Sequence, residues 1–213
     1  FNVMLPRFNI KTTFVDPSNP KNFSDACKKN TRLFFAESLG NPKLDVLDLD
    51  KISLESKKFK VPFMVDNTVA TPALLNPIKH GANIVIYSLT KYINGNGTAL
   101  GGAVIDAGNF DWSNGNFPEF TSPSPGYHGL VYYEALGPAA FIAKVRVEGL
   151  RDLGAAISPF NSFQILQGLE TLDVRMKKHS ENALKIANWL DSLEEVSWAV
   201  SYTHLRAHET SEN

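Results

Sequence analysis

Three short apolar runs constrain the fold of this chain more than any other feature. They cover residues 31–36, 61–65 and 84–87, and the segments between them are long enough to hold crossover helices. Runs of this length are typical of β-strands, and strands that alternate with helices form parallel βαβ units. The sequence therefore predicts an α/β fold built on a mostly parallel sheet. Ligands bind beyond the carboxyl ends of the strands in such sheets, so the residues after each run are candidates for a site.

The segments between and after these runs predict further elements. Residues 49–59 follow Asp48, a natural helix cap, and place apolar side chains, including Phe59, on one helical face. A second helix is predicted over residues 72–80, because Gly81 is a typical residue just past a helix end. The other expected elements are a strand at 100–105, a long loop at 113–129, and helices at 134–150, 161–176 and 180–193.

Two of the strand ends carry residues with complementary chemistry. Asp66 follows the second run, whereas Ser88, Thr90 and Lys91 follow the third. Pyridoxal phosphate needs an acid for its ring nitrogen, an amine that binds its aldehyde, and hydroxyls for its phosphate. Taken singly, an aspartate at a strand end is more often a turn residue, and a lysine is more often a surface residue. Their placement at neighbouring strand ends is what favours a cofactor site.

The same residues resemble a known family signature. Segments 66–68 (Asp-Asn-Thr), 88–92 (Ser-Leu-Thr-Lys-Tyr) and 94–98 (Asn-Gly-Asn-Gly-Thr) are similar to the cofactor motifs of the Cys/Met-metabolism family of pyridoxal phosphate enzymes, the γ-family of fold type I. Segment 37–42 also matches, and the family places the asparagine that Asn41 resembles near the cofactor ring. The resemblance implies helices on both faces of the sheet. It also implies Lys91 as the catalytic lysine, with cofactor contacts from Asn41, Asp66, Thr68, Ser88, Thr90 and Lys91.

Segments further along the chain resemble one branch of that family, the O-acetylhomoserine sulfhydrylases. They include residues 125–130, 150–155 and 166–172. The resemblance implies a γ-replacement reaction of O-acetyl-L-homoserine with sulfide or a thiol, giving homocysteine or methionine plus acetate in sulfur amino-acid metabolism. Lys91 would move the α-proton, and Asp66 would keep the cofactor ring protonated. Cystathionine γ-synthase, cystathionine γ-lyase and methionine γ-lyase share the cofactor residues and stay open as alternatives.

The resemblance also implies a division of the chain. Residues 1–150 would form part of the large cofactor-binding domain, residues 151–200 the interdomain helix and the start of a small α/β C-terminal domain, and residues 201–213 a non-native tail. The family's glycine-rich phosphate-binding segment and ring-stacking tyrosine would precede Phe1, and its carboxylate-binding arginine would lie beyond the tail. We therefore expect a fragment with weak cofactor binding and little or no turnover, from a homotetrameric parent protein.

Two further motifs have alternative interpretations. Ser88 and Lys91 also have the Ser-x-x-Lys spacing of serine β-lactamases, but the Ser-Asp-Asn and Lys-Thr-Gly strings of that class do not occur in the sequence. Tyr127 and His128 lie in a segment rich in proline and glycine. We expect them to pack this loop rather than to act as a catalytic acid or base.

Composition argues against several other classes of protein. The 213 residues are 43% hydrophobic, with a formal charge of −1 and one cysteine, Cys27. This composition fits a chain with a sizeable core, no disulfides and a reducing, cytoplasmic location. No apolar run approaches the ~18 residues of a membrane span, and no basic block indicates nucleic-acid binding. We expect an enzyme that acts on a small molecule and has no metal site.

Overall fold

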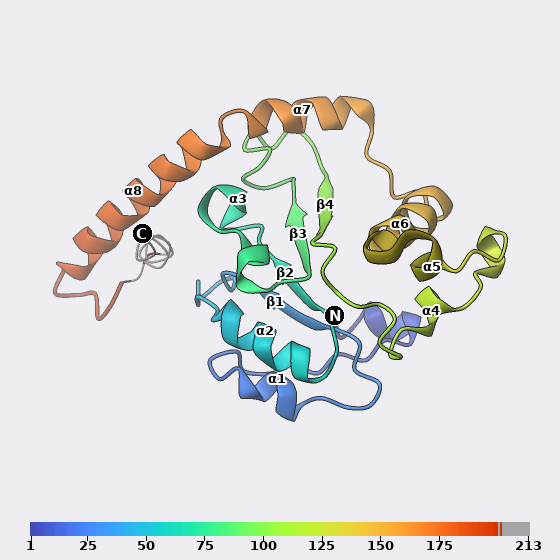
Figure 1. The fold of residues 1–213 in the computed structure, drawn as a ribbon. Helices are drawn as coiled ribbons and strands as arrows, with labels where there is room; N and C mark the ends of the chain where they lie inside the picture. The colour runs from blue at the N-terminus through green and yellow to red at the C-terminus, as the bar shows by residue number, and fades with distance from the viewer. Residues whose placement is uncertain (200, 202–213) are drawn as a thin grey trace.

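The centre of the described part of the chain is a four-stranded sheet. The computed structural model describes residues 1–199 and 201, so the tail predicted over residues 201–213 lies, apart from Ser201, outside the described residues. The strands lie in the order β1 (Phe34–Glu37), β2 (Phe63–Asp66), β3 (Ile84–Ser88) and β4 (Gly102–Asp106) (Figure 1). β1, β2 and β3 run parallel to one another. The prediction of a mostly parallel sheet is therefore confirmed.

The fourth strand differs from its predecessors in direction. The strand predicted at residues 100–105 begins at Gly102 and pairs antiparallel with β3, Ser88 lying opposite Gly102. Parallel neighbours need a crossover connection, usually a helix. The segment between β3 and β4 instead makes tight backbone turns, such as Gly95 N to Lys91 O at 2.8 Å, and so reverses the chain.

The helical elements cover the faces and one end of the sheet. In the described part of the chain, no helix is both long and apolar enough to cross a membrane. The α-helices are α1 (Lys21–Asp25), α2 (Leu49–Lys58), α3 (Thr71–Leu74), α4 (Pro118–Thr121), α5 (Tyr132–Leu136), α6 (Ala140–Lys144), α7 (Pro159–Leu169) and α8 (Leu172–Asp191). The 3-10 helices are η1 (Leu5–Phe8), η2 (Pro77–His80), η3 (Pro125–Tyr127) and η4 (Gly137–Ala139), and η5 (Val145–Asp152) is a π-helix.

α2 forms where the sequence predicts it. The side chain of Asp48 accepts a hydrogen bond from the backbone N–H of Lys51, so it caps the first turn. Leu49 and Ile52 are buried, as expected for the apolar face. Phe59 does not share that face: it follows the last residue of the helix and is 42% exposed.

Replacing Asp48 with alanine is expected to lower the free energy of unfolding by about 1 kcal/mol, because an amide donor of the first turn of α2 loses its acceptor. Urea denaturation followed by circular dichroism measures the change. Asp25→Ala is the matched control, since the side chain of Asp25 is exposed and makes no hydrogen bond within the described residues. An equal loss in both variants would show that removal of charge, and not loss of the cap, is responsible.

The helix predicted over residues 72–80 is two short helices instead. α3 ends where Leu75 becomes extended, with φ −146° and ψ 135°. Asn76 then starts η2, its side chain accepting from the N–H of Ile78, with Pro77 in the first turn. A proline at this position favours a new helix start over a continuing helix. Gly81 has φ 83° just past the end of η2, which confirms the predicted role of this glycine.

Apolar residues pack on both faces of the sheet. On one face, Phe63 and Val65 of β2 belong to a cluster that includes Ile52 of α2 and Met176 of α8. Successive strand residues point to opposite faces, so the neighbouring side chains reach a second cluster. That cluster contains Ile84, Trp112, Phe117, Phe120, Tyr132 and Ala140. Because α1, α2 and α8 contribute to the first cluster and α4, α5 and α6 to the second, the expectation of helices on both faces is confirmed.

The helical segments after β4 depart from the predicted bounds. The helix expected over residues 134–150 breaks at Gly137, whose φ of 51° and ψ of −123° suit a glycine, and Pro138 starts a new turn. The loop at 113–129 contains α4 and η3. The helices expected at 161–176 and 180–193 are instead α7 and one continuous α8. Figure 1 shows α7 beyond the end of β3, with α8 leading away from the sheet.

Candidate active site

The predicted acid and amine come to the same edge of the sheet. Asp66 is the last residue of β2, and Ser88 is the last residue of β3. The two strands are parallel neighbours, with Asp66 in register with Ile86. Ser88 is two residues beyond Ile86, so alternation places Asp66 and Ser88 toward the same face. Lys91 follows three residues after Ser88, at this carboxyl edge.

Thr68 connects the two strand ends. Its backbone N–H and its hydroxyl both donate to Oδ1 of Asp66, at 2.9 and 2.5 Å. The same hydroxyl oxygen accepts a hydrogen bond from the backbone N–H of Ser88 at 2.8 Å. Within the described residues, Oδ2 of Asp66 accepts no hydrogen bond. The carboxylate is therefore held by one oxygen and can accept a hydrogen bond from a ligand with the other.

Asn67, just after β2, is hydrogen-bonded to residues at the ends of β1 and β3, a role that the sequence does not predict. It is fully buried, and its Oδ1 accepts from the hydroxyl of Ser38 at 2.7 Å. Its Nδ2 donates to the carbonyl oxygens of Thr71 and Leu75 and to the hydroxyl oxygen of Tyr87. Burial raises the pKa of Tyr87. The sequence shows only that Asn67 is a polar residue within the Asp-Asn-Thr motif, and this does not reveal its hydrogen-bond partners.

Lys91 lies in a tight turn with its side chain exposed. Its backbone N–H donates to the carbonyl oxygen of Ser88, and its own carbonyl oxygen accepts from the N–H of Gly95. Within residues 1–199 and 201, its ammonium makes no ion pair. The turn therefore presents an amine that no other described side chain engages.

Thr90, a predicted phosphate contact, is hydrogen-bonded to Gly101. Its hydroxyl accepts from the backbone N–H of Gly101 at 3.1 Å and donates to the carbonyl oxygen of Gly101 at 3.3 Å. The hydroxyl thus fastens the turn after β3 to the start of β4. Ser88 is the other predicted phosphate contact, and its hydroxyl makes no hydrogen bond within the described part of the chain.

Asn41 reaches the same edge of the sheet from β1. β1 pairs with β2 so that Glu37 lies beside Asp66. Asn41 follows four residues later, is exposed, and donates its backbone N–H to Oε2 of Glu37 at 3.0 Å. No hydrogen bond among the described residues joins its side chain to the other predicted site residues. Asn41 therefore lies at the same edge of the sheet as Asp66, and its predicted cofactor contact stays a prediction.

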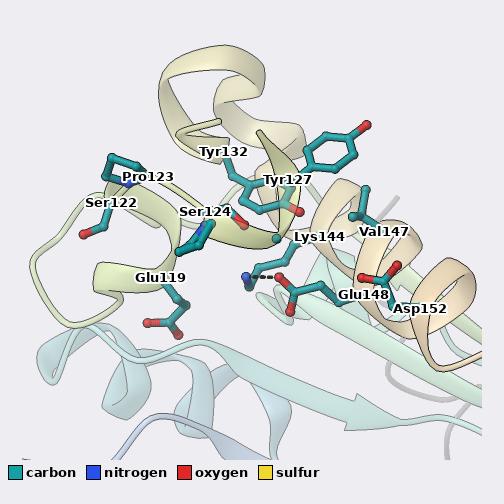
Figure 2. A pocket seen from close by; sticks show the side chains of 12 residues that line it. Glu119, Ser122, Pro123, Ser124, Tyr127, Tyr132, Lys144, Val147, Glu148 and Asp152 are labelled. Carbon is teal, nitrogen blue, oxygen red and sulfur yellow. Dashed lines mark hydrogen bonds and ion pairs between the residues drawn. The ribbon is translucent and has the colours of Figure 1, made fainter. Parts of the chain in front are cut away.

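A separate cavity of about 370 Å³ lies among the elements from α4 to η5. Figure 2 shows Tyr132, Lys144 and Glu148 among its lining side chains, and an ion pair joins Lys144 to Glu148. Tyr127 stacks on Tyr132, with ring centroids 6.1 Å apart and planes 7° apart. None of the predicted cofactor-binding residues lines this cavity. The packing of Tyr127 agrees with the structural role expected for this loop.

The chain is similar in sequence to curated proteins along most of its length. The chain is 52% identical over 208 residues to an O-acetyl-L-homoserine sulfhydrylase from Leptospira meyeri, an alignment that covers 94% of this chain and 47% of the relative. The chain spans about half the length of the curated relatives it matches.

Solved structures give the same result for the fold. A protein from Campylobacter jejuni, assigned as an O-acetylhomoserine (thiol)-lyase and carrying an N'-pyridoxyl-lysine-5'-monophosphate residue, superposes with a TM-score of 0.86 at 42% identity, covering 91% of this chain and 48% of that chain. An O-acetylhomoserine sulfhydrylase from Wolinella succinogenes gives a TM-score of 0.78 at 36% identity, covering 92% and 52%. The fold is therefore that of fold type I enzymes, as predicted. Residues 1–213 also match the family described as Cys/Met metabolism PLP-dependent enzyme, and the chain belongs to that family.

Proposed function

We propose that the chain supplies the cofactor-binding core of an enzyme for γ-replacement on O-acetyl-L-homoserine. Sulfide or a thiol would displace acetate from the γ-carbon, giving homocysteine or methionine. The observation that carries the proposal is the arrangement of Asp66 and Lys91 at the carboxyl ends of two adjacent parallel strands. The names of the relatives in the comparisons support the choice of this reaction over other reactions of the family.

The side chains at this edge fit pyridoxal phosphate. When bound, the cofactor supplies an electron sink for a negative charge at the α-carbon of an amino-acid substrate. Asp66, held through Oδ1 by Thr68, would use Oδ2 to keep the ring nitrogen protonated. Ser88 would donate its hydroxyl to the phosphate, and Asn41 would lie near the ring. Thr90 would contribute to the phosphate site only by exchanging its hydrogen bonds with Gly101.

Lys91 has two roles in the proposed reaction. Its amine, which no other described side chain engages, would bind the aldehyde of the cofactor in the resting enzyme. Once released by substrate, the amine would take the proton from the α-carbon as a general base and hold it for later transfer. Proton loss from the β-carbon would then allow acetate to leave the γ-carbon. Addition of sulfide or the thiol at the γ-carbon and return of the protons to the α- and β-carbons would complete the replacement of acetate.

We also propose the domain organisation, the oligomeric state and the cellular location of the enzyme. Residues 1–150 would belong to the large cofactor-binding domain, and residues 151–200 would begin a small C-terminal domain. Assembly of the whole protein into a homotetramer and a cytoplasmic location fit a metabolic enzyme that acts on small molecules. Gel filtration with light scattering of a protein of the relatives' full length would measure the assembly.

Reductive trapping tests the cofactor site directly. The purified chain is incubated with pyridoxal phosphate, its visible absorption spectrum is recorded, borohydride is added, and the labelled peptide is mapped by mass spectrometry. We expect a visible band and an adduct on Lys91. Preferential labelling of another lysine would overturn the site assignment.

Turnover is expected to be low or absent in these 213 residues tested alone, because they span about half the length of the relatives they match. Homocysteine formation from O-acetylhomoserine and sulfide should appear when the same sequence is tested in a protein of the relatives' length. Full activity of the short chain would contradict the expectation of low turnover. Absence of product from the longer protein would reject the proposed reaction.

A further inference from the structure

Arg175 of α8 binds the backbone that immediately follows Lys91. Its Nη1 donates to the carbonyl oxygen of Tyr92 at 2.8 Å, and its Nη2 contacts the carbonyl oxygen of Ile93 at 3.4 Å. Nη2 also donates to the carbonyl oxygen of Gly168, at the end of α7, at 2.7 Å. One guanidinium therefore joins the turn that contains Lys91 (residues 91–95, the lysine turn) to the junction between α7 and α8.

The orientation of Arg175 is fixed from its own helix. Its Nε donates to the hydroxyl oxygen of Thr171, one helical turn earlier, at 2.9 Å. A guanidinium is planar and presents its donors in a rigid fork, so four acceptors can be bound in one fixed geometry. A lysine ammonium on a flexible chain cannot reproduce this arrangement.

Close packing surrounds the contact on both sides. Gly95 has φ 73°, and a Cβ atom there would lie 2.6 Å from Nη1 of Arg175. Asn94 is fully buried, and its carbonyl oxygen would lie 1.9 Å from a Cβ atom at Gly168. The ring of Tyr92 also packs on His179 of α8, with centroids 5.5 Å apart. The lysine turn is therefore seated against the α7–α8 junction, with Arg175 as its polar attachment.

We propose that Arg175 is a positioning residue for Lys91, holding the turn of residues 91–95 so that the lysine amine is presented at the carboxyl edge of the sheet. The proposal rests on the proposed function, because it assumes that Lys91 is the lysine that binds the cofactor. In this role Arg175 acts through the backbone of Tyr92 and Ile93, whose carbonyl oxygens it binds. α8, expected to lead into the C-terminal domain, thereby orients a residue that lies 84 positions earlier in the chain.

The experiment compares Arg175→Met, Arg175→Lys and the control Lys177→Met. Lys177 is an exposed cation on the same helix, so its removal reproduces the charge change without the contacts. The first readout is amide hydrogen exchange at Asn94 and Gly95, whose N–H groups bond to Leu89 and Lys91 across the turn. The second is the ratio of pyridoxal phosphate–borohydride labelling at Lys91 to labelling at Lys185, an exposed internal reference.

Arg175→Met is expected to accelerate exchange of the two amides by about tenfold or more and to lower the labelling ratio by about tenfold, because several charge-assisted hydrogen bonds are lost. Arg175→Lys should restore part of both effects, and Lys177→Met should change neither. Protection of the β1–β3 amides reports whether the fold is intact. If Arg175→Met loses that protection, Arg175→Lys is compared with wild type instead. Faster exchange at Asn94 and Gly95 together with a lower labelling ratio would then support the positioning role, and no change in either would overturn it.

The outcomes separate the positioning role from a merely structural one. Unchanged exchange in a folded Arg175→Met variant would overturn the proposal, and so would faster exchange with an unchanged labelling ratio. If the wild-type chain labels Lys91 no more than Lys185, the proposed cofactor site itself fails, and the positioning role fails with it. A selective wild-type label that Arg175→Met does not weaken would reject only the role of Arg175.

Discussion

Replacing Lys91 with alanine is expected to abolish both the visible absorption band and the borohydride-trapped adduct. The covalent bond to the aldehyde needs a primary amine, and the alanine variant has none at this strand end. We expect labelling of the corresponding peptide to fall by at least about 100-fold, to background. The free energy of unfolding should stay within about 0.5 kcal/mol of wild type, because the side chain is exposed and forms no ion pair within the described residues.

Lys79→Ala is the matched control for this experiment. Lys79 is also exposed, lies in the last turn of η2, and is not among the residues predicted at the site. Its removal should leave the band and the Lys91 adduct unchanged. A band of undiminished strength in Lys91→Ala, trapped on another lysine, would show that the acid and amine at the strand ends do not form the cofactor site.

The strand ends were predictable because they depend on local sequence. Apolar runs of four to six residues can be recognised without knowledge of their neighbours, and parallel strands bring their carboxyl ends to one edge whatever the detailed packing. This is sufficient to place Asp66 and Lys91 together. The cap at Asp48 and the glycine at Gly81 were equally local, since each acts within one helical turn. Asn41 and Thr68 needed the family resemblance, because their residue types occur in many turns.

The contacts that organise the site were not predictable in this way. Arg175 and Tyr92 are 83 residues apart, and an arginine in an amphipathic helix is ordinarily a solvated residue. The burial of Asn67 depends on three strands meeting at one point, which no single segment encodes. The hydroxyl of Thr90 bonds to Gly101 because β4 turns back beside β3, and its contact with a phosphate stays a prediction.

Gly168→Ala is expected to destabilise the fold strongly, against the intrinsic preference of the helix. In an exposed helix interior, alanine is more favourable than glycine by about 1 kcal/mol. At Gly168, however, the new Cβ atom would lie 1.9 Å from the carbonyl oxygen and 2.6 Å from the carbonyl carbon of Asn94. These are backbone atoms of a buried residue, so relief of the clash requires α7 or the lysine turn to move.

Overpacking of this kind costs about 1–3 kcal/mol and sometimes more, so it outweighs the helical preference. A clash with buried backbone atoms lies at the upper end of that range, so after the helical preference of about 1 kcal/mol is subtracted we expect a net loss of about 2 kcal/mol in the free energy of unfolding, measured by urea denaturation. Gly149→Ala is the matched control, because Gly149 lies in the helical segment η5 and its added Cβ would meet only a side-chain carbon of Val145 at 4.0 Å. That variant should be neutral or slightly stabilised. Equal stability of the two variants would show that α7 does not abut Asn94, and the seating of the Lys91 turn against the α7–α8 junction would then be wrong.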